Sequence, residues 1–238
     1  QPRVLVCACT GKAASLIKGI TIHSAFEFKI GNKFETLSPK KRAEMQENLQ
    51  HLKLLIIDEM SFVGADLLYR IHLRLSEEIF QNNKPFGGIS VILVGDLLQL
   101  SPIKENYIFQ RPNNSHLAAG YEADPLWPQF TPMILKHNHR QGEGGAWTES
   151  LNRFREGIVL KEDEEILKGR ITNDTTLDAR SLHLAFQRIE VANHNENMLN
   201  VLQNPLISIK TKKNNGVSKF VVPLIVIKTV LLLFGYKV

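Results

Sequence analysis

The residues Leu54-Leu55-Ile56-Ile57-Asp58-Glu59-Met60-Ser61 form an apolar run that ends abruptly at two adjacent carboxylates. Four consecutive aliphatic residues are typical of a strand buried on both faces, as in a parallel sheet covered by helices. Asp58 and Glu59 would then lie at the carboxyl end of that strand, where open α/β sheets bind their ligands. Two carboxylates there can serve a metal ion and an attacking water. A buried strand that ends in a solvated acidic turn is the alternative interpretation.

A second apolar run has the same form. It extends from Ile89 to Val94 and is followed by Gly95, Asp96 and a turn that reaches Pro102. Because parallel strands of one sheet end at the same edge, the two runs predict a single polar rim. Its side chains are Asp58, Glu59, Asp96 and Gln99. Two such runs favour a functional site over a coincidence.

Helical segments separate the apolar runs. Pro39 to Leu52 has helical composition with a charged face, and Leu67 to Phe80 repeats apolar residues at helical spacing. With a first strand from Val4 to Cys9, the order is β-α-β-α-β, the signature of a doubly wound, mostly parallel α/β sheet. Arg70 and Arg74 lie on the helix side away from the apolar stripe, where they would be solvated or would face DNA.

The turn after the first predicted strand is a candidate phosphate site. Thr10 and Gly11 precede a helix whose first backbone N–H groups could bind an anion, although an ordinary capped turn is an equal alternative. Cys7 and Cys9 alternate along the strand, and a disulfide at that spacing would be strained. We therefore expect two small buried hydrophobic residues in a reducing, intracellular compartment.

A strand that ends in Asp-Glu is the Walker B arrangement of a P-loop NTPase, in which the Asp helps to hold Mg²⁺ beside the phosphates of ATP. The Glu orients the attacking water and accepts its proton. The Walker A pattern Gly-x-x-x-x-Gly-Lys-Ser/Thr occurs nowhere in the 238 residues. Arg140 lies at the end of a further strand predicted from Met133 onward. It would bring a planar cation to the same rim, where it could neutralise charge on a transferring phosphoryl group.

Charge is distributed unevenly along the chain, which has a formal net charge of +5. Its 29 basic residues include six after Glu196, so the part up to Glu196 has 23 basic side chains against all 24 acidic ones. The overall basicity is therefore weak evidence for nucleic-acid binding. The start at Gln1 is neither a signal peptide nor a translation start, and it predicts a chain that begins inside a domain.

Four parts are predicted along the chain; composition marks the polar and charged junction, and the bounds of the two domains are what the family resemblance described below implies. The four parts are a truncated first domain (1–141), a connecting helix and junction (142–181), the start of a second domain (182–215) and an uncertain apolar tail (216–238). In the second domain, Leu182 to Phe186 is expected as a strand and Ile189 to Leu202 as a helix. The apolar stretch Phe220 to Phe234 is shorter than the roughly 20 residues that span a bilayer, so no membrane anchor is predicted. Buried strands and a tail foreign to the fold are the two interpretations of it.

Five clusters of residues, in this order, resemble the motifs of the Pif-type family of superfamily 1 DNA helicases, relatives of RecD that include the helicase part of Helitron transposons. They are Thr10-Gly11-Lys12-Ala13-Ala14 (motif Ia), Gly19-Ile20-Thr21-Ile22-His23-Ser24, Ile57-Asp58-Glu59-Met60-Ser61 (motif II), Gly95-Asp96-Leu97-Leu98-Gln99-Leu100-Ser101-Pro102 (motif III) and Leu135-x-x-Asn138-x-Arg140-Gln141 (motif IV). The resemblance covers residues 3–141. Weaker similarity continues through Arg153 to Gly157 and Leu182 to Leu202.

The resemblance implies a RecA-like fold, with the start of a second RecA-like domain, and a nucleotide site made by four residues. Asp58 would hold Mg²⁺ through water, and Glu59 would be the catalytic base for ATP hydrolysis. Gln99 would sense the γ-phosphate and link it to the DNA groove, and Arg140 would stabilise the transition state.

The resemblance also implies a motor that moves 5′ to 3′ along single-stranded DNA and unwinds forked DNA. Thr10, Gly11, Lys12 and His23 would line the DNA path, where backbone contacts give sequence-tolerant, salt-sensitive binding. Roles in repair, recombination or telomere maintenance and a nuclear or mitochondrial location would follow from such a substrate.

Two parts of the family pattern are not recognisable in this chain. The Walker A strand and loop should precede residue 1, and motifs V and VI should follow the second-domain strands. We therefore predict a helicase fragment that does not hydrolyse ATP at a useful rate by itself, whereas a longer parent would. The alternative is a non-catalytic, transposon-derived remnant that binds nucleic acid or a protein partner.

Overall fold

The computed structural model describes residues 3–29, 34–114, 117, 125–136, 139, 145–171, 183–201, 206–213 and 216–223. They belong to two compact units, Gln1–Gly169 and Arg170–Val238. Arg140 lies outside the described residues, and so do residues 224–238 of the predicted tail. The domain boundaries drawn from the sequence stay predictions.

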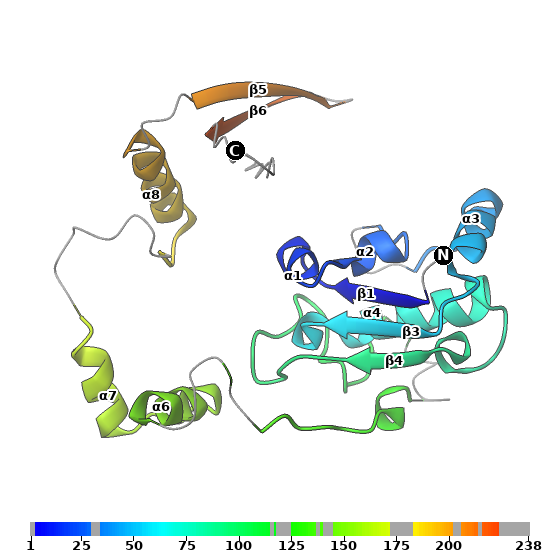
Figure 1. Ribbon diagram of the computed structural model, residues 1–238, viewed down its shortest axis with the longest axis horizontal. Helices are drawn as coiled ribbons and strands as arrows, with labels where there is room; N and C mark the ends of the chain where they lie inside the picture. The colour runs from blue at the N-terminus through cyan, green and yellow to red at the C-terminus, as the bar shows by residue number, and fades with distance from the viewer. Residues whose placement is uncertain are drawn as a thin grey trace. The chain divides into compact units, whose positions relative to one another are not determined.

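The first unit is built on a four-stranded parallel sheet (Figure 1). Its strands are β1 (Val4–Ala8), β2 (Ile20–Thr21), β3 (Leu54–Asp58) and β4 (Ser90–Leu93), in the order β2-β1-β3-β4. Leu54 pairs with both Val4 and Ser90, and Asp58 pairs with Ala8. The three apolar runs of the sequence are therefore adjacent strands, and the predicted parallel α/β sheet is confirmed.

Burial stabilises these strands. Leu55 and Ile57 of β3 are completely buried, and so is Cys7 of β1. Full burial of an aliphatic side chain contributes about 1.5–3 kcal/mol, so β3 is the apolar centre of the unit. Burial also raises the pKa of the Cys7 thiol to about 12, so this free cysteine is the small hydrophobic residue that the sequence predicts.

Helices cover the sheet, with α1 and α2 beside β1 and α4 behind the strands in Figure 1. The described helices of this unit are α1 (Gly11–Leu16), α2 (Ile22–Ala25), α3 (Pro39–Leu49), η1 (Met60–Phe62), α4 (Ala65–Leu73), η2 (Arg74–Ile79), η3 (Pro85–Gly88), η4 (Trp127–Gln129), α6 (Ala146–Arg155) and α7 (Lys161–Lys168). The helix predicted from Leu67 to Phe80 is present. Its second half, η2, is a π-helix that continues α4 directly.

Arg74 is buried, which corrects the expectation that it faces solvent or DNA. The residue is only 1% exposed. Its guanidinium donates from Nε to the Phe26 carbonyl at 3.1 Å and from Nη2 to the Glu35 carbonyl at 3.0 Å, and it pairs with Glu78. Arg74 therefore ties the π-helix to both ends of the segment that follows α2.

Arg70 is buried to the same extent, which corrects the second half of that expectation. Its guanidinium carbon lies 4.5 Å from the centroid of the Phe28 ring, and that of Arg74 lies 5.1 Å from the same ring. A planar cation over an aromatic face is attractive and is stronger when desolvated. Phe28 and Glu35 thus lie against this side of the helix, where both arginines are buried.

Two predicted strands do not form within the parts of them that the structure describes. Residues 131–136 make no strand, and Met133, Ile134 and Leu135 are between 84% and 89% exposed. The strand expected from Leu182 to Phe186 is likewise absent from its described residues, 183–186. An apolar segment becomes a strand only where another strand satisfies its backbone groups, and no described strand pairs with either segment.

The second unit contains α8 (Arg188–Val201) and a hairpin of two antiparallel strands, β5 (Leu206–Lys213) and β6 (Gly216–Pro223). α8 agrees with the helix predicted from Ile189 to Leu202. None of the helices in the described ranges is long and apolar enough to cross a membrane.

Replacing Arg74 with Met should destabilise the protein by about 3–5 kcal/mol, because the carboxylate of Glu78 would remain buried without its main cationic partner. Urea unfolding measures the loss. Arg42→Met is the control, because Arg42 reaches Glu78 at 3.5 Å from a position where its side chain is 36% exposed. That change should cost less than about 1 kcal/mol. Equal losses in the two variants would contradict a structural role that is particular to the buried arginine.

Candidate functional site

The carboxyl ends of β3 and β4 meet at one edge of the sheet. Val94 donates its N–H to the Ile57 carbonyl at 2.8 Å, and Met60 donates to the Val94 carbonyl at 2.9 Å. The segments that follow β3 and β4 therefore stay hydrogen-bonded to each other beyond the ends of the two strands. This pairing brings Asp58 and Glu59 beside the segment that starts at Gly95, so motifs II and III share one rim, as the sequence predicts.

Two backbone features shape this rim. Gly95 has a φ of +151°, and a Cβ at this position would lie 2.7 Å from the backbone nitrogen of Met60. Glu59 has a left-handed backbone, with φ 54° and ψ 50°. That conformation costs a non-glycine residue about 1–2 kcal/mol. Strained residues often lie at functional sites, so this conformation agrees with the motif. It does not single out Glu59, because five other described non-glycine residues also have a positive φ.

The end of β1 also lies near Glu59. Burial raises the pKa of the Cys9 thiol to about 12, with smaller contributions from the negative charges of Glu105 and Glu59. The thiol is therefore protonated at neutral pH and is a poor nucleophile. The chemistry of the rim is left to its carboxylates and amide side chains.

Asp96 organises the turn after β4. Its Oδ1 accepts the Leu98 N–H at 3.0 Å, and its carbonyl accepts the Gln99 N–H at 3.0 Å. The Oδ2 atom of this carboxylate lies 2.7 Å from Nε of Arg155. Burial alone would raise the pKa of Asp96, but the hydrogen bonds from Arg155 and Leu98 and the charge of Arg155 hold it below its usual value. Asp96 is thus ionised at neutral pH, and Gln99 is held on an exposed turn.

The donor set at the rim fits Mg²⁺. This ion prefers oxygen ligands and usually takes one or two carboxylates from the protein, with waters and substrate phosphates completing the octahedron. Asp58 and Glu59, both half-buried, offer such oxygens at the end of β3. Within the described ranges, no three His, Cys, Asp or Glu side chains cluster closely enough to hold a metal ion by themselves.

Two of the predicted DNA-contacting segments follow neighbouring strands. Thr10 caps α1, and its hydroxyl oxygen accepts the Ala13 N–H at 3.2 Å, so the capped turn expected as one alternative is present. Gly11 and Lys12 follow at the exposed start of the helix. A Cβ at Gly11 would meet no atom within 4 Å, which leaves its backbone open to a ligand.

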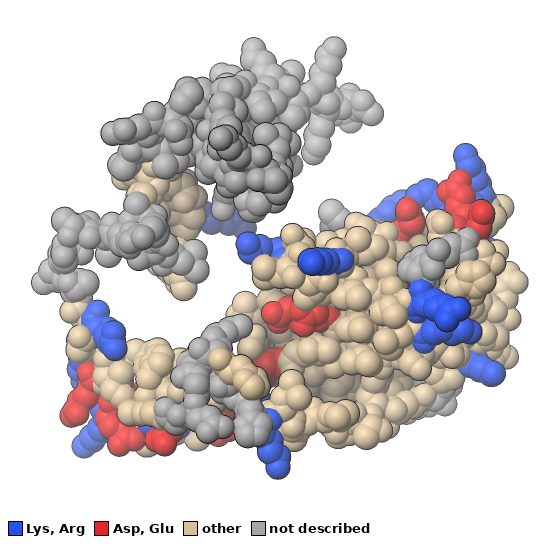
Figure 2. Space-filling model, in the orientation of Figure 1, with Lys and Arg blue, Asp and Glu red and all other residues tan. Residues whose placement is uncertain are grey.

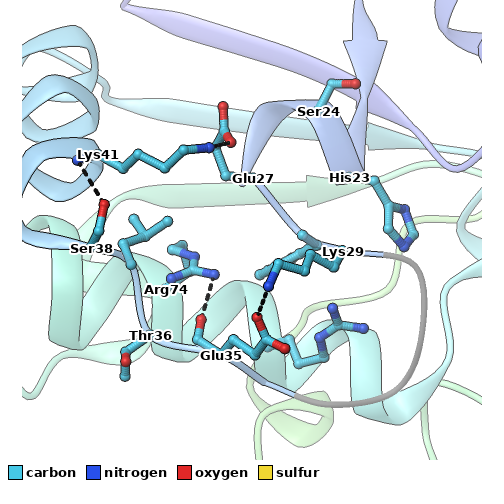
Figure 3. Close-up of a pocket in the computed structure, with 12 residues that line it drawn as sticks. His23, Ser24, Glu27, Lys29, Glu35, Thr36, Ser38, Lys41 and Arg74 are labelled. Atoms are coloured by element: carbon cyan, nitrogen blue, oxygen red, sulfur yellow. Dashed lines mark hydrogen bonds and ion pairs between the residues drawn. The ribbon is translucent and has the colours of Figure 1, made fainter. Parts of the chain in front are cut away.

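His23 lies on α2, after β2, next to a pocket of about 610 Å³ (Figure 3). Burial lowers the pKa of His23, and the positive charge of Arg70 lowers it further. Lys29 pairs with Glu35, and Lys41 pairs with Glu27, across the same pocket. The sequence analysis did not find these pairs, because none of the four residues belongs to a recognised motif.

The chain matches the family described as PIF1-like helicase over residues 1–173. It is 30% identical over 201 residues to the ATP-dependent DNA helicase PIF1 of Saccharomyces cerevisiae (strain YJM789). The aligned region is 82% of this chain and 22% of the yeast protein.

Several solved structures are similar to the chain, among them two Pif1 helicases. The crystal structure of Pif1 helicase from Candida albicans has a TM-score of 0.68 at 28% identity, over 88% of this chain and 47% of that one. The crystal structure of Bacteroides Pif1 bound to single-stranded DNA has a TM-score of 0.62 at 20% identity, over 93% of this chain and 54% of that one. The chain thus spans about half of the solved helicases and a smaller share of the yeast protein. With the predicted RecA-like α/β fold, these matches show that the chain belongs to the PIF1-like helicase family.

Proposed function

We propose that this chain is part of an ATP-dependent DNA helicase that moves 5′ to 3′ along single-stranded DNA and unwinds forked DNA. The observation that carries the proposal is the shared rim of β3 and β4. It places Asp58 and Glu59 beside the turn that holds Gln99, and it keeps Glu59 in a strained backbone conformation. Acids at a strand end beside a polar sensor side chain suit hydrolysis of a bound nucleotide.

Each residue of the rim then has a role in hydrolysis. Asp58 holds Mg²⁺ through water, and Glu59 orients the attacking water and takes its proton. Gln99 contacts the γ-phosphate from the turn after β4. Arg140 stabilises charge on the transferring phosphoryl group, a role that rests on its motif alone because the residue lies outside the described ranges. When bound, Mg²⁺ neutralises charge on the phosphates.

The outer face of β4 supports a further strand in the parent protein. Among the described strands β4 lies at one edge of the sheet, and Ile92 of β4 and Val94 just after it are 47% and 41% exposed. Exposed apolar side chains on an edge strand are a liability that folded proteins usually cover. A neighbouring strand that leads into a Walker A loop would cover them and would supply the phosphate contacts that this chain lacks.

DNA is the second partner that we propose. Thr10, Gly11, Lys12 and His23 follow adjacent strands, so one strand of nucleic acid could contact all four. Figure 2 shows Lys and Arg side chains spread over the visible face of the first unit, with acidic side chains among them. Such a surface suits local backbone and phosphate contacts better than attraction by one large basic patch. We also propose a nuclear or mitochondrial location for the parent, because such a substrate is found there.

ATP hydrolysis tests the proposal. The protein encoded by the longest reading frame that contains this chain and a Walker A loop should hydrolyse ATP faster with single-stranded DNA. Glu59→Gln should lower its kcat by about 10²- to 10⁴-fold, because general-base catalysis is lost. The 238-residue chain alone should show no such turnover.

The other outcomes favour other conclusions. Turnover by the 238-residue chain that disappears in Glu59→Gln would show that it has its own phosphate site. A silent longer protein, or a reading frame with no Walker A loop, would favour the non-catalytic remnant that binds nucleic acid or a partner.

The strain at Glu59 gives an independent prediction. Glu59→Gly should be more stable than Glu59→Gln by up to about 1 kcal/mol, because glycine adopts a positive φ without a steric penalty. Urea unfolding of the 238-residue chain compares the two variants. Equal stabilities would mean that the left-handed conformation is not kept in solution.

A further inference from the structure

Arg155 forms an ion pair with Asp96 across a separation of 59 residues. The guanidinium contacts both carboxylate oxygens, with Nε 2.7 Å from Oδ2 and Nη2 3.0 Å from Oδ1. Two parallel contacts between a planar cation and a planar carboxylate fix the orientation of both groups, which one contact does not. The pair therefore sets the direction in which the Asp96 carboxylate points.

The same carboxylate organises the turn that contains Gln99. It accepts the Leu98 N–H at 3.0 Å, and the backbone carbonyl of Asp96 accepts the Gln99 N–H at 3.0 Å. The guanidinium of Arg155 thus holds the residue to which the backbone of the turn is hydrogen-bonded at Leu98 and Gln99. A change in one contact must alter the geometry available to the other.

Arg155 belongs to a helix pair that has its own internal bracing. Asp163 of α7 accepts the Ser150 hydroxyl at 2.6 Å and the Arg153 Nε–H at 2.9 Å, both from α6. Its Oδ2 also accepts the Leu160 N–H at 2.9 Å, which fixes the start of α7. Because Ser150 and Asp163 are completely buried, α6 and α7 should move together. Arg155, at the end of α6, would carry such a movement to Asp96.

We propose that Arg155 is a positioning residue, which holds Gln99 through Asp96 and makes the γ-phosphate sensor respond to movement of the α6–α7 pair. This inference rests on the proposed function, because only a nucleotide site gives Gln99 something to sense. Arg155 touches neither nucleotide nor DNA in this scheme. We call the ion pair of Arg155 and Asp96 the latch, because it joins the α6–α7 pair to the turn after β4 and can be broken.

Exposure of the pair supports a latch that can open. The side chains of Arg155 and Asp96 are 47% and 22% exposed, so water can replace either partner at little cost. A partly exposed ion pair is worth far less than a buried one. The ion pair can therefore favour one conformation of the turn after β4 without preventing others.

Hydrogen exchange in the 238-residue chain tests the contact without any need for ATP hydrolysis. In Arg155→Gln, the Leu98 and Gln99 amides should exchange about two- to fivefold faster, the range for losing a partly exposed ion pair. Arg155→Lys should lie between the wild type and this variant, since it keeps the charge but loses the two-point contact. Lys168→Gln is the control, because it removes another exposed ion pair, with Glu164 on α7.

The exchange pattern separates positioning from structural support. Exchange within residues 146–168 should stay unchanged in Arg155→Gln. Unchanged exchange at Leu98 and Gln99 would overturn the proposal. So would faster exchange that is equally large within α6 and α7, because it would show that Arg155 only stabilises its own helices.

A double-mutant cycle in the longer, Walker A-containing protein tests the coupling to hydrolysis. Arg155→Gln and Asp96→Asn should each reduce the stimulation of kcat by single-stranded DNA, and the double variant should be no worse than the more severe single one. Additive losses would overturn the shared latch. A silent wild-type protein would overturn the proposed function and, with it, the link to the sensor, even where exchange shows that the ion pair exists.

Discussion

The parallel pairing of β3 with β1 and β4 is the constraint on which the rest of the first unit depends. Parallel strands end at the same edge, so the register that pairs Asp58 with Ala8 also fixes where the turns after all three strands lie. The hydrogen bonds of Val94 and Met60 extend that register past the strands. The close approach at Gly95 and the strain at Glu59 are consequences of this continued pairing.

Much of this architecture could be predicted, because a strand buried on both faces lacks polar alternation and ends where its charges begin. The same reasoning failed at Met133 to Leu135, since an apolar run specifies a strand only if a partner is present. The same reasoning also failed at Arg70 and Arg74. Helical periodicity places both residues on the side away from the apolar stripe, and that side was expected to face solvent or DNA. Their burial depends on carbonyl and aromatic groups up to 48 residues away, and local spacing holds no information about these.

The candidate site shows the same division. The neighbourhood of Asp58, Glu59 and the turn that holds Gln99 followed from strand adjacency. Neither the left-handed backbone of Glu59 nor the contact of Arg155 with Asp96 could be predicted. The first depends on how the chain leaves β3 against Met60 and Gly95, and the second depends on where a distant helix packs.

The two arginine contacts serve different purposes because their solvent exposure differs. Arg74 pairs with Glu78 where both side chains are at most 4% exposed. Breaking the pair would leave a buried charge without a partner, so the contact persists. Arg155 pairs with Asp96 at the surface, where water screens both partners and the contact can open. A segment that must keep its shape, such as the one after α2, needs the first kind of pair. A turn that must respond to a ligand needs the second kind, and in this protein the exposed pair lies on the rim where Gln99 is held.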